Sequence, residues 1–490
     1  MKRLIVFVFA CLLSAPSCHE KDSHTSTVSD RETINSWIEE NMKYYYLWND
    51  RINTERLDKT EDPAQYFNEI IVPDDHLSHI ENGFESLLHK WAETEKSGYS
   101  YSLYSTETDD VLGKITYVVK ESPADKSGLT RGAIFTKING TALSIHNYRT
   151  LTAQITDSHT LTVRDDNSTE TDYAVPVARF AENPVFLDTI YNINNRKTGY
   201  LVYNAFTSDD SNFSQEYETH LNDVFGKFKD QNINELILDL RYNCTGHILN
   251  SMLLASLIVA SRNPQEIYAQ YHYNKSLQQI IKSEFGDDYL NLYYADAVND
   301  RILNNIGDQL DRIFILTSPK TGIMSEILVN NLRLSMNVFV IGNRTSGENG
   351  FSVALYEDDP EKQRVNTWII APVMMCISDK NGNTDVTIIP NVEITEPLYD
   401  KTPLGDTREE ILATALNIIS GNSSPLSPYS KYQILEQDIN LQEHQTDNIS
   451  GNDIANAAGM QFKLSRQYLP PVFRKYRQDF HPADLQAGKN

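Results

Sequence analysis

Residues 315–350 read ILTSPKTGIMSEILVNNLRLSMNVFVIGNRTSGENG, and this stretch carries the strongest signal for the fold class. The apolar runs at 313–317 and 338–342 have the length and composition of buried strands, and residues 325–336 between them predict a helix. Strands that alternate with helices form βαβ units around a largely parallel sheet. The stretch therefore predicts an α/β domain.

The same alternation continues toward the amino terminus. Residues 199–204 and 236–240 predict further strands, and residues 213–229 and 248–260 predict helices. Nearer the start, residues 34–45 place apolar side chains at helical spacing, which predicts a small helical domain.

Length, charge and cysteine content limit the classes of protein. At 490 residues the chain exceeds a typical domain of roughly 100 to 150 residues several-fold, so we expect two to four domains. Its formal net charge of -24 argues against a nucleic-acid partner, because a polyanion would be repelled. Cys244 and Cys376 allow at most one disulfide after the amino-terminal segment. We expect no cofactor and no metal ion, since His76 and His79 lack an accompanying ligand cluster.

The first residues predict export. A positively charged start precedes an apolar run at 4–13 that is too short to span a bilayer. Residues 1–17 resemble a bacterial lipoprotein signal peptide, with Cys18 as the acylated first residue and the polar residues 18–31 as a tether. Pro16 departs from that pattern, so soluble secretion is the alternative. The resemblance implies a cell-envelope protein anchored by lipid in the outer membrane.

Residues 315–350 resemble the active-site stretch of the carboxy-terminal processing, or tail-specific, serine peptidase family. In that family a strand precedes T-A-S-A-S-E at the start of a helix, and a second strand ends in I-G before T-x-G-K. The residues that match without a gap are Thr321, Ser325, Glu326, Ile341, Gly342, Thr345 and Gly347. The resemblance places the family nucleophile at Ile323 and the family base at Glu348.

These two substitutions remove the chemistry that the resemblance implies. A Ser/Lys dyad needs a hydroxyl that attacks a carbonyl and an amine whose lowered pKa lets it accept the hydroxyl proton. Ile323 has no nucleophilic atom, and Glu348 has no hydroxyl at that position to deprotonate. We therefore predict no peptidase activity by the family mechanism.

The oxyanion loop also departs from the family pattern. After the strand 236–240 the family reads L-R-x-N-G-G-G, in which backbone amides stabilise the oxyanion. This chain has Leu240, Arg241 and Asn243, followed by Cys244, Thr245 and Gly246. Two glycines are replaced by residues with a Cβ, which disfavours close backbone approach. A relocated nucleophile, with Cys244, His247 and Glu348 as a triad, is the competing hypothesis.

Residues 98–177 alternate short β-like runs with turns, and they contain the segments 121–129 and 138–140, ESPADKSGL and ING. They resemble a PDZ domain, with Ala133 where Asp is usual. PDZ domains add an extended peptide to a sheet edge and bind its terminal carboxylate through backbone amides. The residues expected to form the carboxylate loop and its strand are Gly98, Tyr99, Ser100 and Tyr101. A packing domain that binds nothing is the alternative.

The resemblance covers nearly the whole chain and implies a multidomain α+β fold. Its expected parts are a helical amino-terminal domain at 32–96, a PDZ domain at 97–178, an α/β spiral peptidase core of the crotonase and Clp type at 179–420, and an extension at 421–490. The leading hypothesis is a degenerate peptidase that binds peptides or protein carboxy termini. The alternatives are an active serine-type or cysteine-type endopeptidase that processes exported proteins, and a non-catalytic partner subunit of an envelope complex.

Overall fold

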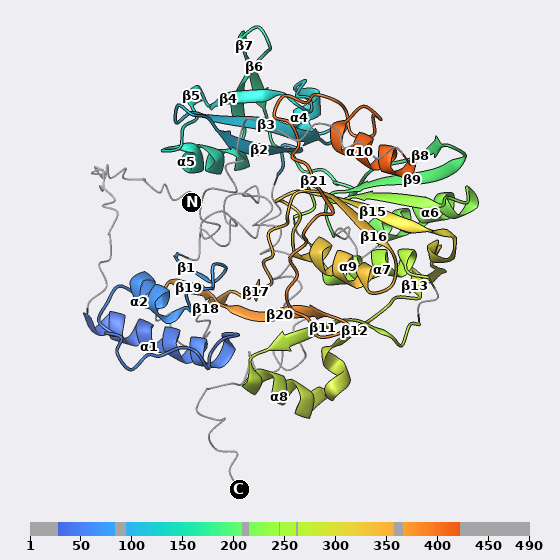
Figure 1. Cartoon of the computed structure of the whole chain (residues 1–490). Helices are drawn as coiled ribbons and strands as arrows, with labels where there is room; N and C mark the ends of the chain where they lie inside the picture. Colours follow the sequence, from blue (N-terminus) through green and yellow to red (C-terminus); the bar gives the residue numbers. More distant parts are fainter. Residues whose placement is uncertain are drawn as a thin grey trace, which may run out of the picture.

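The computed structural model describes residues 28–83, 95–207, 215–244, 246–260, 263–356 and 366–421. Within these ranges no helix is both long enough and apolar enough to cross a membrane. The predicted signal peptide, Cys18, Thr245 and all residues after Gly421 lie outside the description. Figure 1 shows an amino-terminal helical part, a small β domain and a larger core built around a sheet.

The helical part contains α1 (Val28–Tyr45) and α2 (Pro63–Ile70). Ile34, Ile38 and Met42 repeat at every fourth position along α1 and are buried, as an amphipathic helix requires. α1 includes residues 28–31, which the sequence analysis assigned to the tether. Asp30 lies in the first turn, where a negative charge interacts favourably with the helix dipole, and this favours the earlier start.

Strand β1 (His79–Asn82) joins the helical part to the core. It pairs antiparallel with β19 (Trp368–Ala371), which in turn pairs with β18 (Leu355–Tyr356). The apolar cluster of the helical part also includes Ile370 and Val373 of the core. The two parts therefore share one hydrophobic cluster and one small sheet.

The β domain is an antiparallel sheet in the order β2-β3-β4-β6-β7, with β5 paired to β4. Its elements are β2 (Tyr99–Ser105), β3 (Val111–Val118), α4 (Pro123–Lys126), β4 (Ile134–Ile138), β5 (Thr141–Ala142), α5 (Tyr148–Thr152), β6 (His159–Arg164) and β7 (Glu170–Val175). β2 is an edge strand of this sheet. This is the strand to which the PDZ resemblance assigns peptide binding.

The core is built on a six-stranded sheet in the order β21-β16-β15-β10-β9-β8. Its strands are β8 (Val185–Ile193), β9 (Arg196–Tyr203), β10 (Glu235–Asp239), β15 (Arg312–Thr317), β16 (Val338–Gly342) and β21 (Val392–Glu393). Every neighbouring pair is parallel except β8 with β9. The largely parallel sheet predicted from the alternation of strands and helices is confirmed.

Helices bury both faces of this sheet. They are α6 (Glu216–Asp230), α7 (Ile248–Ile258), α9 (Ile323–Arg333) and α10 (Glu410–Ile419). Alternate side chains of β10 point to opposite faces, so Leu236 and Leu238 pack with α6, α7 and α9, whereas Ile237 packs with α10. Burial on both faces explains why the strand sequences are continuous apolar runs.

A second sheet and several short elements complete the core. Strands β11 (Ile267–Tyr273), β12 (Asn291–Tyr293), β17 (Phe351–Ser352) and β20 (Val373–Asp379) form a four-stranded sheet, beside which lies α8 (Lys275–Phe285). Strands β13 (Ala297–Val298) and β14 (Arg301–Ile302) pair as a hairpin. Single 3-10 turns occupy Ala153–Thr156, Asp287–Leu290 and Gly307–Gln309.

The carboxyl ends of β10, β15 and β16 lie side by side, because these strands are adjacent and parallel. The loops that leave this edge of the sheet are 240–247, 318–322 and 343–350. In open α/β sheets, ligands bind at the carboxyl ends of the strands. The fold thus brings together the three segments in which the sequence departs from the peptidase pattern.

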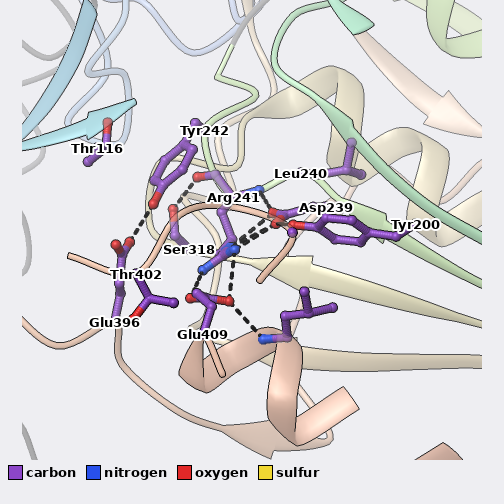
Figure 2. Close-up of polar contacts among 12 residues, drawn as sticks. Thr116, Tyr200, Asp239, Leu240, Arg241, Tyr242, Ser318, Glu396, Thr402 and Glu409 are labelled. Carbon is purple, nitrogen blue, oxygen red and sulfur yellow. Dashed lines mark hydrogen bonds and ion pairs between the residues drawn. The ribbon is translucent and has the colours of Figure 1, made fainter. Parts of the chain in front are cut away.

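Two buried cations fasten the β domain to the core. The Lys114 ammonium lies 2.7 Å from Glu396 Oε1, and the Arg131 guanidinium lies 2.8 Å from the same oxygen. Burial acts to raise the pKa of Glu396, but the two cations lower it overall, so this carboxyl is ionised. The Tyr242 hydroxyl donates to Glu396 Oε2 at 2.6 Å (Figure 2). Glu396 therefore links the β domain to the loop after β10.

Replacing Glu396 by Gln would leave Lys114 buried without its counter-charge and Arg131 with only its longer contact to Glu409, at 3.9 Å. Because removing one partner of a buried ion pair costs about 3 to 5 kcal/mol, we expect Glu396→Gln to lower the free energy of unfolding by about 3 kcal/mol in urea denaturation. Asp166→Asn is the matched control, since it removes the exposed contact of Asp166 with Lys401 and should cost less than about 0.5 kcal/mol. Equal losses in the two variants would contradict this role of Glu396.

Candidate functional site

The segment that leads to the family nucleophile position is bonded to the loop after β10. Thr321 Oγ1 donates to the Leu240 carbonyl at 2.9 Å, and the Gly322 amide donates to the Asn243 carbonyl at 2.9 Å. These bonds cross from the end of β15 to the end of β10, which are neighbouring parallel strands. The two loops therefore form one connected surface.

Helix α9 begins at Ile323, two residues before the predicted start, because Gly322 serves as its N-cap. Gly322 approaches the preceding loop so closely that a Cβ there would lie 2.1 Å from the Cys244 carbonyl oxygen. The half-buried Ile323 side chain packs partly against the main apolar cluster of the core. The start of α9 thus presents a hydrocarbon where the family resemblance requires a hydroxyl.

The family base position, Glu348, lies on the loop after β16. The Gly347 amide donates to Glu326 Oε1 of α9 at 2.7 Å. Gly350, two residues after Glu348, lies close to the helical part. A Cβ at this glycine would lie 2.6 Å from Leu77 Cδ1. Both carboxyl oxygens of Glu348 are buried and have no hydrogen-bond partner among the described residues.

Burial, followed by the negative charges of Glu326 and Asp75, raises the pKa of Glu348 to about 8. Asp75 belongs to the segment between α2 and β1, and its carboxylate accepts hydrogen bonds from the Tyr46 hydroxyl at 2.8 Å and from two backbone amides at 3.0 Å. Glu348 therefore holds its proton at neutral pH and is a neutral carboxylic acid.

Glu326 is fully buried, and burial raises its pKa to about 7. The Thr345 hydroxyl and the Gly347 amide act to lower this pKa, while the charge of Asp385 raises it. Two carboxyl groups with raised pKa values thus lie close to each other, one on α9 and one on the loop after β16. At neutral pH Glu348 is therefore largely protonated, whereas Glu326 is divided between its protonated and ionised forms.

Sequence reasoning located Glu348 but missed its two acidic neighbours. Glu326 was noted as a motif match, and only the parallel pairing of β15 with β16 shows that it lies beside the following loop. Asp75 comes from a distant part of the chain, and its proximity depends on the packing of the helical part on the core. No local signal in the sequence could have indicated this contact.

The loop after β10 is anchored by the guanidinium of Arg241, which is fully buried (Figure 2). Nη1 donates to Glu409 Oε1 and Nη2 donates to Asp239 Oδ2, each at 2.7 Å. Tyr200 donates to the same Asp239 oxygen at 2.8 Å. The Arg241 carbonyl accepts a hydrogen bond from Ser318, which begins the segment leading to α9. A buried charge needs such pairing, so this end of the loop is held in place.

The predicted oxyanion positions lie further along this loop. Gly246 has a φ of +135°, and a Cβ there would lie 2.4 Å from the Phe206 carbonyl oxygen, so glycine is required. Cys244 is half-buried and forms no disulfide among the described residues. Thr245 lies outside the description. The structure therefore retains a glycine at Gly246 and places the Cys244 carbonyl against α9.

The alternative triad requires His247 to interact with Glu348. Burial lowers the pKa of His247 to about 4. The charges that act on Glu348 come from Glu326 and Asp75, not from an imidazole. A catalytic His–carboxylate pair would instead raise the imidazole pKa. The electrostatics of the described residues thus give the triad no support.

The predicted carboxylate loop begins at Gly98, whose φ of +82° favours glycine. The Gly98 carbonyl accepts a hydrogen bond from the Val119 amide at 2.8 Å. The Tyr99 hydroxyl lies 2.8 Å from Nε2 of His159, which fixes this side chain against β6. Ser100 continues the strand opposite Tyr117. Carboxylate binding by this loop stays a prediction.

Tyr101 lies on the edge strand β2. Its partner in β3 is Ile115, whose amide donates to Ala133 on the opposite side, so the backbone groups of Tyr101 face outward. The Tyr101 carbonyl accepts a hydrogen bond from the Lys320 ammonium, which also lies 5.7 Å from the centre of the Tyr101 ring. Since Lys320 precedes α9 by three residues, the edge of the β domain lies beside the position of Ile323.

Comparison with protein families agrees with this architecture. Residues 197–373 match the model of peptidase family S41, residues 33–101 match that of the peptidase S41 N-terminal domain, and residues 114–165 match that of a PDZ domain. The fold and domain order define a multidomain α+β protein of the tail-specific peptidase class. The chain belongs to peptidase family S41.

Solved structures are similar over most of the chain. An S41 family protein from Bacteroides fragilis NCTC 9343 has a TM-score of 0.60 and 24% identity, covering 79% of this chain and 98% of that chain. The photosystem II D1 C-terminal processing protease has a TM-score of 0.47 and 14% identity, covering 79% and 98%. Mature CPAF has a TM-score of 0.46 and 10% identity, covering 81% and 99%. No curated protein matches the chain.

Replacing Glu348 by Gln should stabilise the protein in a pH-dependent way. The pKa of Glu348 is about 8 in the folded chain, against an ordinary value of 4.5. The unfolded chain therefore releases this proton at lower pH than the folded chain, so the free energy of unfolding falls as pH rises between these two values. The slope is at most about 1.4 kcal/mol per pH unit. We expect the gain in unfolding free energy for Glu348→Gln to exceed about 2 kcal/mol at pH near 7.5 and to shrink near pH 4.5.

Urea denaturation at the two pH values measures this difference. Glu55→Gln, at an exposed position in the helical part, is the control and should leave stability nearly unchanged at both. A gain from Glu348→Gln that is the same at both pH values would show that the carboxyl is not held neutral in the folded chain.

Proposed function

We propose that the protein binds the carboxy-terminal ends of peptides or unfolded proteins and does not cleave them by Ser/Lys chemistry. The observation that carries the proposal is the pair of side chains at the family dyad positions. Ile323 supplies no nucleophile, and Glu348 is a buried neutral acid at physiological pH. Loss of a nucleophile leaves at most the contribution of binding and oxyanion contacts.

The retained binding elements support a recognition role. β2 is an edge strand of the described sheet, and an added peptide strand could pair along such an edge. Lys320 holds the Tyr101 carbonyl in the free protein, so a bound peptide would replace this contact with a backbone amide. A peptide on this edge would run beside the start of α9, where the former catalytic cleft lies.

We further propose that this binding takes place in the cell envelope, with the protein exported and attached to the membrane by lipid at Cys18. The support is the sequence of residues 1–17, which has the charge and apolar pattern of a signal peptide and ends before a cysteine. The acidic net charge of -24 suits a solvated protein that avoids polyanions. Release of the chain from membranes by Cys18→Ala would support the anchor.

Cleavage and binding can be measured on the same purified protein. With an unfolded protein substrate we expect no cleavage. With a short labelled peptide we expect binding that weakens about tenfold or more when the terminal carboxylate is amidated, because charge-assisted hydrogen bonds are lost. Equal binding of the free and amidated peptides would reject recognition of the carboxylate.

Two variants test whether Cys244 acts as a relocated nucleophile. Cleavage that persists in Ile323→Ala but disappears in Cys244→Ala would contradict the proposal and assign catalysis to a relocated cysteine. Both positions are half-buried, so the truncations should leave the fold intact.

A further inference from the structure

The six-stranded sheet of the core ends in a long edge strand. β8 is its last strand and contains nine residues. In Figure 1, β8 and its turn into β9 lie at the outer end of the core, away from the helical part. Among the other edge strands of the described sheets, β2 has seven residues, β7 has six, and the rest have four or fewer. β8 is therefore the longest edge strand in the part of the chain that the structure describes.

The turn between β8 and β9 fixes which backbone groups of β8 point away from the sheet. Its two central residues, Asn194 and Asn195, have φ values of 49° and 65°, as a type I′ hairpin turn requires. Lys197 of β9 lies opposite Asn192 of β8. The amide and the carbonyl of Lys197 both bond to Asn234, on the side of β9 away from β8, at 3.4 and 2.8 Å. Asn192 and Lys197 therefore form a pair without hydrogen bonds to each other.

In an antiparallel pair, the backbone groups of successive residues point to alternate sides of the strand. Asp188, Ile190 and Asn192 consequently direct their amides and carbonyls away from β9, whereas Thr189 and Tyr191 bond to it. No backbone group of another described residue bonds to these three outward positions. The edge thus offers three donors and three acceptors in one row.

β8 lacks the features by which proteins protect the edges of their sheets. Such features include lysine, proline and a bulge within the strand. Residues 185–193 read VFLDTIYNI, without lysine or proline, and the irregularity in their register lies at the start, between Val185 and Leu187. The one charged side chain, Asp188, forms an ion pair with Lys227 of α6. The rest of the strand can therefore accept another strand.

A second copy of the chain fits this edge. If two β8 strands pair antiparallel about a two-fold axis at Ile190, Asp188 of each copy lies opposite Asn192 of the other. All the outward amides and carbonyls of residues 188–192 are then paired. No carboxylate lies opposite another, so this register avoids the like-charge pairs that destabilise neighbouring strands. An axis at Asp188 would instead bring the two carboxylates together.

We propose that β8 is the interface of a two-fold dimer in which a second copy of this chain joins the two six-stranded sheets into one. The inference goes beyond the proposed binding of peptides and does not depend on it. It assigns an interaction surface at the end of the core, with a partner that is chemically identical.

Charge and interface size set the expected affinity. Each copy carries a formal net charge of -24, so two copies repel each other at low ionic strength. Salt screens this repulsion, whereas it leaves backbone hydrogen bonds largely unaffected. Because one strand from each copy makes a small interface, we expect a dissociation constant of about 1 to 100 μM that falls as salt is added.

The test measures the association of the full chain and the state of its edge in the same samples. Sedimentation velocity at about 1 to 100 μM, in low and high salt, gives the dissociation constant. Hydrogen exchange with mass spectrometry follows the segment 185–193. Asn192→Asp would put carboxylates opposite each other in the dimer. Asn167→Asp, at an exposed position between β6 and β7, is the control with the same change of charge.

We expect Asn192→Asp to weaken the dimer about tenfold or more in low salt and Asn167→Asp to leave it nearly unchanged. The amides of Asp188, Ile190 and Asn192 should exchange more slowly as the dimer forms. A monomer at every concentration and salt, or a dimer indifferent to Asn192→Asp, would overturn the inference. Slow exchange of these amides in a monomer would show that another segment of the chain covers the edge, and it would overturn the inference as well.

Discussion

A fully buried guanidinium fixes the geometry on which the site depends. Arg241 lies between Asp239, at the end of β10, and Glu409, at the N-cap of α10, and its buried guanidinium forms ion pairs with both carboxylates. The loop after β10 is therefore bonded to the start of α10, which packs on the opposite face of the sheet from α6, α7 and α9. The adjacent Tyr242 reaches Glu396, which also receives the two cations of the β domain (Figure 2). One connected polar network thus positions the oxyanion segment and the β domain together.

Much of the fold could be predicted because its determinants are local in the chain. The apolar runs at 313–317 and 338–342 are buried on both faces of the sheet, and such runs leave a clear signal in the sequence. Ile323 and Glu348 could be located because the motif around them needs no gap. The charge of Asp75 on Glu348 could not be predicted, since the segment before β1 is brought to the core by a shared apolar cluster and by the pairing of β1 with β19. Contacts between distant segments leave no periodic pattern to read.

The scaffold of the family and the chemistry of the site are separate properties of this chain. The parallel strands bring three loops to one edge of the sheet, where ligands bind in open α/β folds. At the positions that the resemblance assigns to the dyad, Ile323 offers a hydrocarbon and burial raises the pKa of Glu348 to about 8. The proposed recognition role depends on these two side chains, because one fold can carry many chemistries.

The proposed function depends on the protonation state of Glu348. Carbon-13 NMR titration of the glutamate side-chain carboxyls in the full chain measures this state, with Glu348→Gln used to assign the signal. We expect one carboxyl signal that titrates near pH 8 and is absent from the variant. A signal lost in Glu348→Gln that titrates near the ordinary glutamate value of 4.5 would show that this carboxyl is ionised at physiological pH and would contradict the proposal.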